Sequence, residues 1–307
     1  MSRPRHVGLV GCGGWGRLIL RDLKALGARV TCVAPGERSR ENARQGGADA
    51  IVTTLADLPA VDGAVVATPS DSHGAVALEL VRRGLPVFVE KPLTSDLAQA
   101  RALVEAAPDR VFVMDKWRYH GGIRKLAEVA RDGGLGAVLG LRTFRLGWSM
   151  THNEVDPVWN LLPHDLSISL HVLGHLPPLA WAVTDPLGPP GGGVTALLGQ
   201  SEGPRALVEC SAHHPVNRRS VVLACETGTL TLNASLDDHL LLRRGRPGDA
   251  AATEERVPID TAMPLEAELA AFLDHLRGGP PPLSSAADGL AVVERCCEIR
   301  AFAGIPG

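Results

Sequence analysis

A glycine-rich segment near the N-terminus constrains the fold of this chain more than any other feature. The letters VGCGGWGR place Gly11, Gly13 and Gly16 in a GxGxxG pattern, directly after an apolar run and at the start of a helical segment. Small residues here permit a tight turn, close backbone approach to an anion and close packing of the helix on the strand. Because a helix N-terminus presents unpaired N–H groups, we expect the pyrophosphate of a dinucleotide to bind at this turn.

The other two residues of the turn are Gly14 and Trp15. We expect both to contact the same dinucleotide, and packing is the alternative for the indole of Trp15. A tight turn without any ligand is the alternative for the whole segment.

The first 118 residues alternate short β-branched runs with helical segments. The runs are HVGLVG, ARVTCVA, DAIVT, GAVVAT, PVFVEKP and RVFVMDKW. They are continuously apolar, as expected of parallel strands that helices cover on both faces. The pattern predicts an N-terminal Rossmann domain over residues 1–118, with a doubly wound parallel sheet.

From about Leu135 the pattern changes, and extended runs follow one another with few helices between them. Examples are GAVLGLRTFRL, RALVECSAHH and NRRSVVLACETGTLTLN. Turn signals between such runs predict a large, mainly antiparallel sheet. We therefore expect a second α/β domain over residues 119–307, closed by helices around 266–276 and 286–303, with surface loops near Pro189 and Pro281.

Charge and hydrophobicity exclude several classes of partner. The formal net charge is −3, and Lys and Arg form no long run, so a nucleic-acid partner is not expected. No stretch of about 18 apolar residues occurs, and the N-terminus has no apolar run followed by a cleavage site. We expect a cytoplasmic protein without a membrane anchor.

The cysteines bear on possible disulfides, and one group of histidines bears on a possible metal site. The six cysteines form no CxxC pair, and free, mostly buried thiols are expected. His164, His171 and His175 would share one face of a helix. No cysteine or acid completes a convincing ligand set with them, so we expect no metal site.

The end of the second strand bears on the choice of cofactor. An acid usually stands there in NAD-preferring proteins, but this chain has Ala34, with Arg38 shortly after it. A guanidinium can pair with a 2′-phosphate, so NADP is favoured over NAD. The alternative is that Arg38 is a solvated residue at the start of a helix and that Glu37 reaches the ribose.

At Glu90-Lys91-Pro92 the sequence resembles the Gfo/Idh/MocA family of NAD(P)-dependent oxidoreductases. ATPSDSH is similar to the family's cofactor loop, WNLLPHDLSISLHVLG to its catalytic helix and PLEAELAAFLDHL to its C-terminal helix. The resemblance implies a Rossmann domain, then an α/β domain whose open sheet often forms a dimer or tetramer interface. Cofactor-binding positions implied by it are Thr68, Pro69, His73, Glu90 and Lys91.

The resemblance also implies the catalytic residues. Lys91 matches the family's catalytic lysine, His164 its catalytic histidine, and Asn160 the position usually held by an aspartate. Oxidation of an alcohol needs a neutral base on the hydroxyl, and His164, predicted in the first turn of a helix after Pro163, would be kept neutral by the helix dipole. Lys91 would hold the oxygen from the end of a strand. A core histidine and a surface lysine are the alternatives.

Asn160 departs from the family pattern, because an asparagine orients an imidazole but carries no proton. The relay could then be completed by Lys91, by Asp156 or by Asp165, and Asp165 could instead have only a dipole role. We expect Asn160, His164 and Asp165 to face the substrate.

A polar and aromatic segment follows the sixth predicted strand. Trp117, Arg118 and Tyr119 are expected to form a wall of the substrate pocket, and a salt bridge at the domain junction is the alternative. Trp148, His152 and Trp159 are expected in the loop before the catalytic helix. They would close over the substrate or pack in the core.

Together these features predict an enzyme that interconverts a secondary alcohol and a ketone on a sugar, cyclitol or sugar nucleotide, using NAD or NADP. Its partners would be a small-molecule substrate and further copies of itself, in a homodimer or homotetramer. Two other functions stay open: a glycosidase or epimerase that recycles its cofactor, and a catalytically silent NAD(P)-sensing protein.

Overall fold

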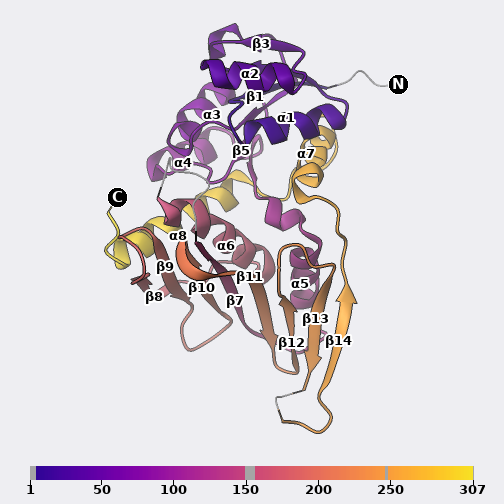
Figure 1. Cartoon of the computed structure of the whole chain (residues 1–307), viewed down its shortest axis with the longest axis vertical. Coiled ribbons are helices and arrows are strands. Elements are labelled where there is room, and N and C mark those ends of the chain that lie inside the picture. Colours follow the sequence, from indigo (N-terminus) through magenta and orange to yellow (C-terminus); the bar gives the residue numbers. More distant parts are fainter. Residues whose placement is uncertain (1–4, 149–155, 246–247, 307) are drawn as a thin grey trace. The chain divides into compact units, whose positions relative to one another are not determined.

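A computed structural model describes residues 5–148, 156–245 and 248–306 of the chain. It divides into two compact units (Figure 1). The first unit comprises Met1–Tyr119 and Met263–Val293, and the second comprises His120–Ala262 and Glu294–Gly307. The predicted boundary after residue 118 lies beside the first of these divisions, but residues 263–293, predicted in the second domain, cluster with the first unit.

The first unit is built on a sheet of six strands, all paired in parallel. In spatial order they are β3 (Ala50–Val52), β2 (Arg29–Val33), β1 (His6–Val10), β4 (Gly63–Val66), β5 (Val87–Glu90) and β6 (Val111–Met114). This order is the Rossmann order, and it confirms the predicted fold of the N-terminal part. Because the strands are parallel, their carboxyl ends meet at one edge of the sheet.

Helices cover both faces of this sheet. They are α1 (Gly16–Ala25), α2 (Glu37–Gln45), α3 (His73–Arg82), α4 (Leu97–Ala106) and α7 (Pro264–His275), with short helices η1 (Leu55–Asp57), η2 (Ser70–Ser72) and η3 (Lys116–Tyr119). The contacts pair α1 with α7, and α3 with α4.

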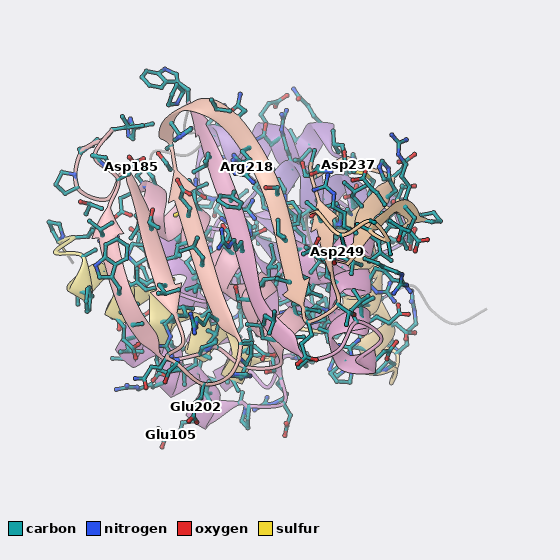
Figure 2. All side chains as sticks on the ribbon, turned by 90° about the horizontal axis from the view of Figure 1, so that it is seen from below. Glu105, Asp185, Glu202, Arg218, Asp237 and Asp249 are labelled. Carbon is teal, nitrogen blue, oxygen red and sulfur yellow. The ribbon has the colours of Figure 1, made fainter. Side chains whose placement is uncertain are left out.

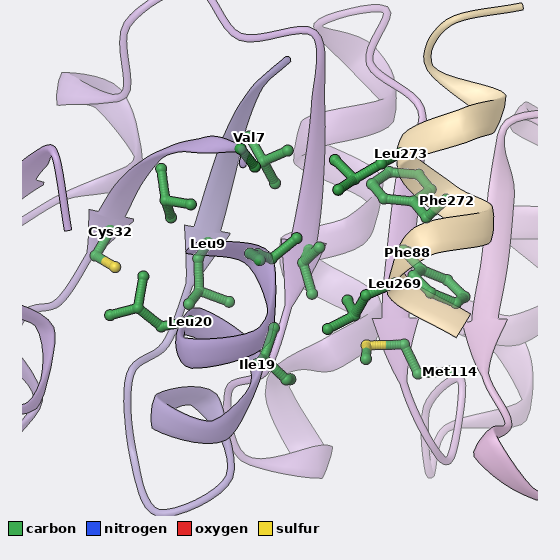
Figure 3. Close-up of a cluster of buried hydrophobic side chains, with 14 of the residues drawn as sticks. Val7, Leu9, Ile19, Leu20, Cys32, Phe88, Met114, Leu269, Phe272 and Leu273 are labelled. Carbon is green, nitrogen blue, oxygen red and sulfur yellow. The ribbon is translucent and has the colours of Figure 1, made fainter. Parts of the chain in front are cut away.

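Helix α7 comes from far along the chain and completes the core of the first unit. Its buried residues Leu265, Leu269, Phe272 and Leu273 form one helical stripe. The rings of Phe272 and Phe88 stack with their centroids 5.1 Å apart, and Figure 3 shows this cluster. Burial of that stripe explains why this segment clusters with the first unit and not with the sheet that precedes it in sequence.

The second unit contains a sheet of eight strands. In spatial order they are β14 (Thr253–Pro258), β13 (His239–Arg244), β12 (Gly228–Leu232), β11 (His213–Cys225), β7 (Val138–Trp148), β10 (Arg205–Ser211), β9 (Gly193–Leu198) and β8 (Leu179–Thr184). Only β7 and β10 pair in parallel, and the other pairs are antiparallel. The predicted mainly antiparallel sheet is confirmed.

Three further helices accompany this sheet. Helices α5 (Gly121–Asp132) and α6 (Pro157–Leu173) pack together, and α6 covers β7, β9 and β10. Helix α8 (Ala286–Phe302) spans the division between the units at Val293. Figure 2 shows the strands of the sheet with their side chains, and Arg218 of β11 lies near the middle.

Two general expectations can be compared with the described residues. Cys12, Cys32, Cys210, Cys225 and Cys296 are buried free thiols, as predicted, and Cys297 is partly buried. No helix in the described ranges has the length and apolarity needed to cross a bilayer.

Candidate functional site

The glycine-rich turn joins β1 to α1 at the carboxyl edge of the first sheet, where the strand order reverses. Gly11 has φ +93°, and a Cβ there would lie 2.5 Å from the carbonyl oxygen of Ala67. A Cβ on Gly16 would collide with the carbonyl oxygen of Gly11. These two glycines are therefore needed for the packing of the turn itself.

The other two glycines of the turn face open space. A Cβ on Gly13 or Gly14 would meet no atom within 4 Å, and neither residue has a positive φ. No side chain among the described residues caps α1, and its first turn holds no acid. Free N–H groups, the positive end of the helix dipole and an open approach together fit a pyrophosphate.

This arrangement predicts that Gly13→Ala weakens dinucleotide binding about tenfold, because the new methyl group would occupy the space of the phosphate (each 1.4 kcal/mol is tenfold). The melting temperature should stay unchanged, since the methyl group meets no protein atom. Titration calorimetry with NAD and NADP measures the affinity. Gly134→Ala, at a glycine equally free of contacts, is the matched control. Unchanged affinity in Gly13→Ala would contradict a phosphate site at this turn.

Asn42 supports the turn and was not predicted. Its Nδ2 donates to the carbonyl oxygen of Cys12 at 2.8 Å. It lies on α2, thirty residues further along the chain, so no local pattern marks it.

His73 braces the two loops that follow β4 and β5. Its ring is buried, and Nδ1 and Nε2 each lie 2.8 Å from a carbonyl oxygen, those of Pro92 and Thr68. Burial lowers the pKa of the imidazole, so the neutral ring donates to one of them. His73 therefore positions the loops that carry Thr68 and Lys91, and the predicted direct contact with a cofactor is not favoured by this geometry.

Thr68 and Pro69 themselves lie at the carboxyl edge, directly after β4. The hydroxyl of Ser72 donates to Oγ1 of Thr68 at 2.8 Å, and Pro69 is exposed. Their position next to the glycine-rich turn agrees with the predicted cofactor loop, because the amide of Ala67 donates to Val10 at the end of β1.

Lys91 follows the last residue of β5 at the same edge of the sheet. It is half-buried, and its neighbour Glu90 is buried. Burial raises the pKa of the Glu90 carboxyl, while the positive charges of Lys91 and Lys116 oppose that shift. Nζ of Lys116 lies 4.6 Å from the ring centroid of Trp15. The indole of Trp15 therefore packs against a cation of its own chain.

The residues after β2 bear on cofactor choice. Ala34 is buried, and its amide donates to Val52 at 2.8 Å. The carboxylate of Glu37 receives hydrogen bonds from Arg40 at 2.6 Å and from Arg44 at 3.3 Å, which lower its pKa. Arg38 is exposed and forms no ion pair within the described ranges. Glu37 and Arg38 were the two residues predicted to contact the ribose. The carboxylate of Glu37 is already paired with Arg40 and Arg44, whereas the guanidinium of Arg38 forms no ion pair within the described ranges.

Two of the three residues predicted to form a substrate wall hold another part of the first unit. Arg118 is buried, donates to the carbonyl oxygen of Leu283 at 2.9 Å and lies 3.2 Å from Asp288. The hydroxyl of Tyr119 accepts from the amide of Leu283 at 2.9 Å. Trp117 is buried beside them. This placement favours the salt-bridge alternative over the predicted contact with substrate.

In the second unit, α6 carries the predicted catalytic histidine. Asp156 caps the helix by accepting from the amide of Trp159 at 3.0 Å, and Pro157 is its first residue. His164 therefore lies in the third turn, and Pro163 lies inside the helix. The prediction that His164 stands in the first turn is wrong, so the helix dipole does not keep its ring neutral, because that effect is confined to the end turns.

Because α6 begins at Pro157, Asn160 and His164 both lie within the helix. Both residues are partly exposed. A spacing of four places them on one face, one turn apart. The two side chains therefore lie on the same side of α6.

Asp165 points the other way, into the sheet. It is buried, and Arg145 of β7 donates to it from Nε at 2.7 Å and from Nη2 at 3.2 Å. Burial raises the pKa of this carboxyl, and the guanidinium opposes the shift. The predicted role of Asp165 in contacting substrate is not supported: the residue anchors α6 to β7 and thereby positions the adjacent His164.

The other candidates on or near α6 have structural partners or lie apart. The carboxylate of Asp156 accepts a hydrogen bond from Nη1 of Arg300 at 2.6 Å. Trp159 is buried, and the guanidinium carbon of Arg300 lies 5.5 Å from the centroid of its ring. Trp148 is 69% exposed, while His152 lies outside the described residues. Trp159 is thus a packing residue.

The three histidines do not form one helical stripe. Helix α6 ends at Leu173, so His175 lies beyond it, and its Nδ1 is 3.2 Å from the carbonyl oxygen of Leu173. In the parts of the chain that the structure describes, no group of three or more His, Cys, Asp or Glu side chains is arranged to hold a metal ion.

Comparison with known proteins places this geometry in context. Residues 5–113 match the model of an oxidoreductase family with an NAD-binding Rossmann fold. The chain is 28% identical to D-apiose dehydrogenase of Paraburkholderia graminis, over 92% of this chain and 83% of that protein. It is 26% identical to UDP-N-acetylglucosamine 3-dehydrogenase of Acidithiobacillus ferrooxidans, over 96% of each protein.

Solved structures share the whole fold. That of the Acidithiobacillus ferrooxidans dehydrogenase has a TM-score of 0.85 at 23% identity and covers 98% of both chains. A levoglucosan dehydrogenase in complex with NADH has a TM-score of 0.85 at 18% identity, over 99% of this chain and 100% of that one. At this identity the two structures support the fold alone.

Proposed function

Since this chain belongs to the Gfo/Idh/MocA oxidoreductases, with an NAD-binding Rossmann domain over residues 5–113, we propose that it interconverts a secondary alcohol and a ketone on a sugar, cyclitol or sugar nucleotide. The relatives named above are dehydrogenases of a pentose and of a nucleotide sugar. Both names are those of dehydrogenases of a sugar or a sugar nucleotide, and this supports the substrate class.

The proposal rests mainly on one observation: the candidate cofactor and catalytic groups of the first unit lie at the same edge of its sheet. The open face of Gly13 and Gly14, the brace of His73 and the ammonium of Lys91 all follow carboxyl ends of parallel strands. Ligands of such sheets bind at that edge. A half-buried lysine beside an anion-binding turn suits a reaction that develops charge on a substrate oxygen.

In this reaction the nicotinamide cofactor, held by the glycine-rich turn, supplies the hydride acceptor or donor. His164 takes the hydroxyl proton in the oxidising direction, since an imidazole is a base near pH 7. Lys91 donates a hydrogen bond to the same oxygen and stabilises its developing negative charge. Asn160 orients the imidazole from one helical turn away and carries no proton.

A substrate panel tests the proposed reaction. The purified protein is incubated with NAD or NADP and with aldoses, inositols and UDP-sugars, and the absorbance of the reduced cofactor is followed. Net formation of reduced cofactor with at least one class supports the proposal. Product without net cofactor change would instead assign a recycling glycosidase or epimerase, and cofactor binding without any turnover would assign a sensing protein.

We further propose that NADP is preferred, because Arg38 is free to meet a 2′-phosphate while Glu37 is held by two arginines. Arg38→Ala should raise the KM for NADP about tenfold and leave the KM for NAD within twofold, as expected for one lost exposed charge-assisted hydrogen bond of about 1.5 kcal/mol. Arg82→Ala, at an exposed arginine of α3, is the control. Equal effects on both cofactors, or a wild-type preference for NAD, would contradict the assignment.

A homodimer or homotetramer is also proposed, through the sheet face that α6 does not cover. Trp181 and Val183 of β8 are 46% and 42% exposed, whereas Ala182 between them is buried. The strand pairing continues this row across the sheet through Leu197 and Leu207. Such an apolar row is unfavourable in water. Light scattering after gel filtration measures the mass, and a monomer of 32.3 kDa would contradict the proposal.

A further inference from the structure

A lysine held against an aromatic ring lies beside the glycine-rich turn, and no role given above uses this pair. Trp15 is the N-cap residue of α1, and its indole packs on the core of the first unit. Nζ of Lys116, the first residue of η3, lies 4.6 Å from the centroid of the Trp15 ring. This contact favours the charged form of the lysine and fixes the position of its ammonium group.

The order of the strands shows what this pair spans. Trp15 follows β1 and Lys116 follows β6, and β4 and β5 lie between these two strands in the sheet. Because neighbouring strands are about 4.8 Å apart, β1 and β6 are separated by roughly 14 Å. The two side chains therefore meet by reaching across the carboxyl ends of β4 and β5, after which Thr68 and Lys91 follow.

Glu90, the last residue of β5, is affected by both members of the pair. Burial raises the pKa of the Glu90 carboxyl, and the charges of Lys91 and Lys116 and the indole N–H of Trp15 lower it. An N–H group has this effect on a carboxyl only at short range. The pair therefore extends over the end of β5, in agreement with the order of the strands.

This position places the pair on one half of the cofactor site. In a doubly wound sheet the pyrophosphate lies at the turn after β1, and the ribose of the adenosine half is bound at the end of β2. The ends of β4 and β5 lie on the other side of β1. They are therefore left for the nicotinamide half, and the ammonium of Lys116 is held on that side.

We propose that the Trp15–Lys116 pair sets a redox preference of the site: its ammonium group disfavours the oxidised cofactor relative to the reduced one. An oxidised nicotinamide ring is positively charged. It becomes neutral when the alcohol carbon gives it a hydride, with the electron pair of the C–H bond, while the hydroxyl proton passes to a base. A fixed positive charge nearby repels the charged ring and not the neutral one.

This preference has a consequence for the reaction. Tighter binding of the reduced cofactor favours oxidation of the bound alcohol, because binding and the change of redox state are linked. That consequence rests on the proposed function, whereas the preference itself concerns cofactor binding alone.

Lys116→Met tests the proposal, because methionine keeps an unbranched side chain against the indole and removes the charge. The Kd of the oxidised cofactor divided by that of the reduced cofactor should fall about fivefold, the size of an interaction between partly solvated charges. Titration calorimetry measures both constants, with NADP and NADPH and again with NAD and NADH. The fall should be smaller at high salt, where such charges are screened.

Two further variants separate charge from packing. Lys116→Arg keeps the charge and the contact with the indole, so it should show the wild-type ratio. Lys24→Met removes a lysine that pairs with Asp49 at 2.6 Å near the other end of α1, and it should also leave the ratio unchanged. The other charged or titratable groups around the pair are the same in every variant: Glu90, Lys91, Asp115, Arg118 and Glu268.

Trp15→Leu tests the part played by the indole. It removes the ring that holds the ammonium, so the ratio should fall, and it should fall no further when Trp15→Leu is added to Lys116→Met. A further fall in the double variant would show that the indole and the ammonium act separately, against the proposal.

Two results with Lys116→Met would overturn the inference. An equal loss of affinity for both redox forms would assign the ammonium to a phosphate group of the cofactor, and unchanged affinities would assign the pair to packing alone. These titrations need no substrate. A protein that shows the expected ratio but oxidises no alcohol would therefore contradict the proposed function and leave this inference intact.

Discussion

Lys91→Met is expected to lower kcat by about 10³-fold, within the range that a positioned proton-handling group contributes. Methionine keeps the length of the side chain but removes the ammonium that would donate to the substrate oxygen. Cofactor affinity should change less than threefold, because the glycine-rich turn is built by Gly11, Gly16 and Asn42 and not by Lys91. Single-turnover kinetics and cofactor titration measure the two quantities separately.

Lys125→Met is the matched control for this substitution. Lys125 lies on α5 in a surface ion pair with Glu128, and its loss should leave kcat unchanged. If Lys91 and His164 act on one proton, adding His164→Gln to Lys91→Met should cost far less than His164→Gln costs alone, because the two losses are not additive. Turnover within twofold of the wild type in Lys91→Met would refute the role of Lys91.

Asp165→Asn is expected to lower the free energy of unfolding by about 3 to 5 kcal/mol, the usual cost of removing one partner from a buried ion pair. The substitution leaves the guanidinium of Arg145 buried without its carboxylate, since both of its hydrogen bonds to Asp165 lie within the core between α6 and β7. Urea denaturation followed by circular dichroism measures the loss.

An exposed ion pair of the same unit provides the control. Arg243 and Glu254 lie 2.6 Å apart on β13 and β14, and both side chains are more than half exposed. Glu254→Gln should cost less than about 1 kcal/mol. If Asp165→Asn cost no more than this control, Asp165 would not anchor α6, and its proposed positioning of His164 would fail with it.

The resemblance predicted from Glu90-Lys91-Pro92 and ATPSDSH agrees with the match of residues 5–113 to an oxidoreductase family with an NAD-binding Rossmann fold. The strands of the first unit were predictable for a local reason. Each is a continuous apolar run between turn signals, and the glycine pattern sits at a fixed distance from the first of them. Local sequence is enough where a parallel sheet needs every strand to be apolar on both faces.

Predictions that depended on partners far along the chain fared less well. Arg118 and Tyr119 form hydrogen bonds with Leu283, more than 160 residues away, and Asp165 pairs with Arg145 on another element. In the sequence each of these residues is only a polar group beside an aromatic or a histidine. Their burial, which decides that they hold the structure together, appears only when the chain is folded.

At the start of α6, local sequence was also insufficient, although the residues involved are close together in the chain. Pro163 in PHDLSI indicates a helix beginning there, but Asp156 and Pro157 supply the cap and the first residue, and Pro163 is accepted inside the helix. A proline signals a helix start only through its missing N–H and fixed φ, and packing of α6 on the sheet outweighs that local preference.

Sequence by itself determined the Rossmann domain, the anion-binding turn and the identities of the lysine and histidine offered for catalysis, because each depends on residue type and short spacing. Tertiary structure alone decided that α7 completes the first unit and that Asp165 is an anchor. These facts depend on which groups lose contact with water, and the free energy of burying a charge is set by neighbours that folding brings together from distant parts of the chain.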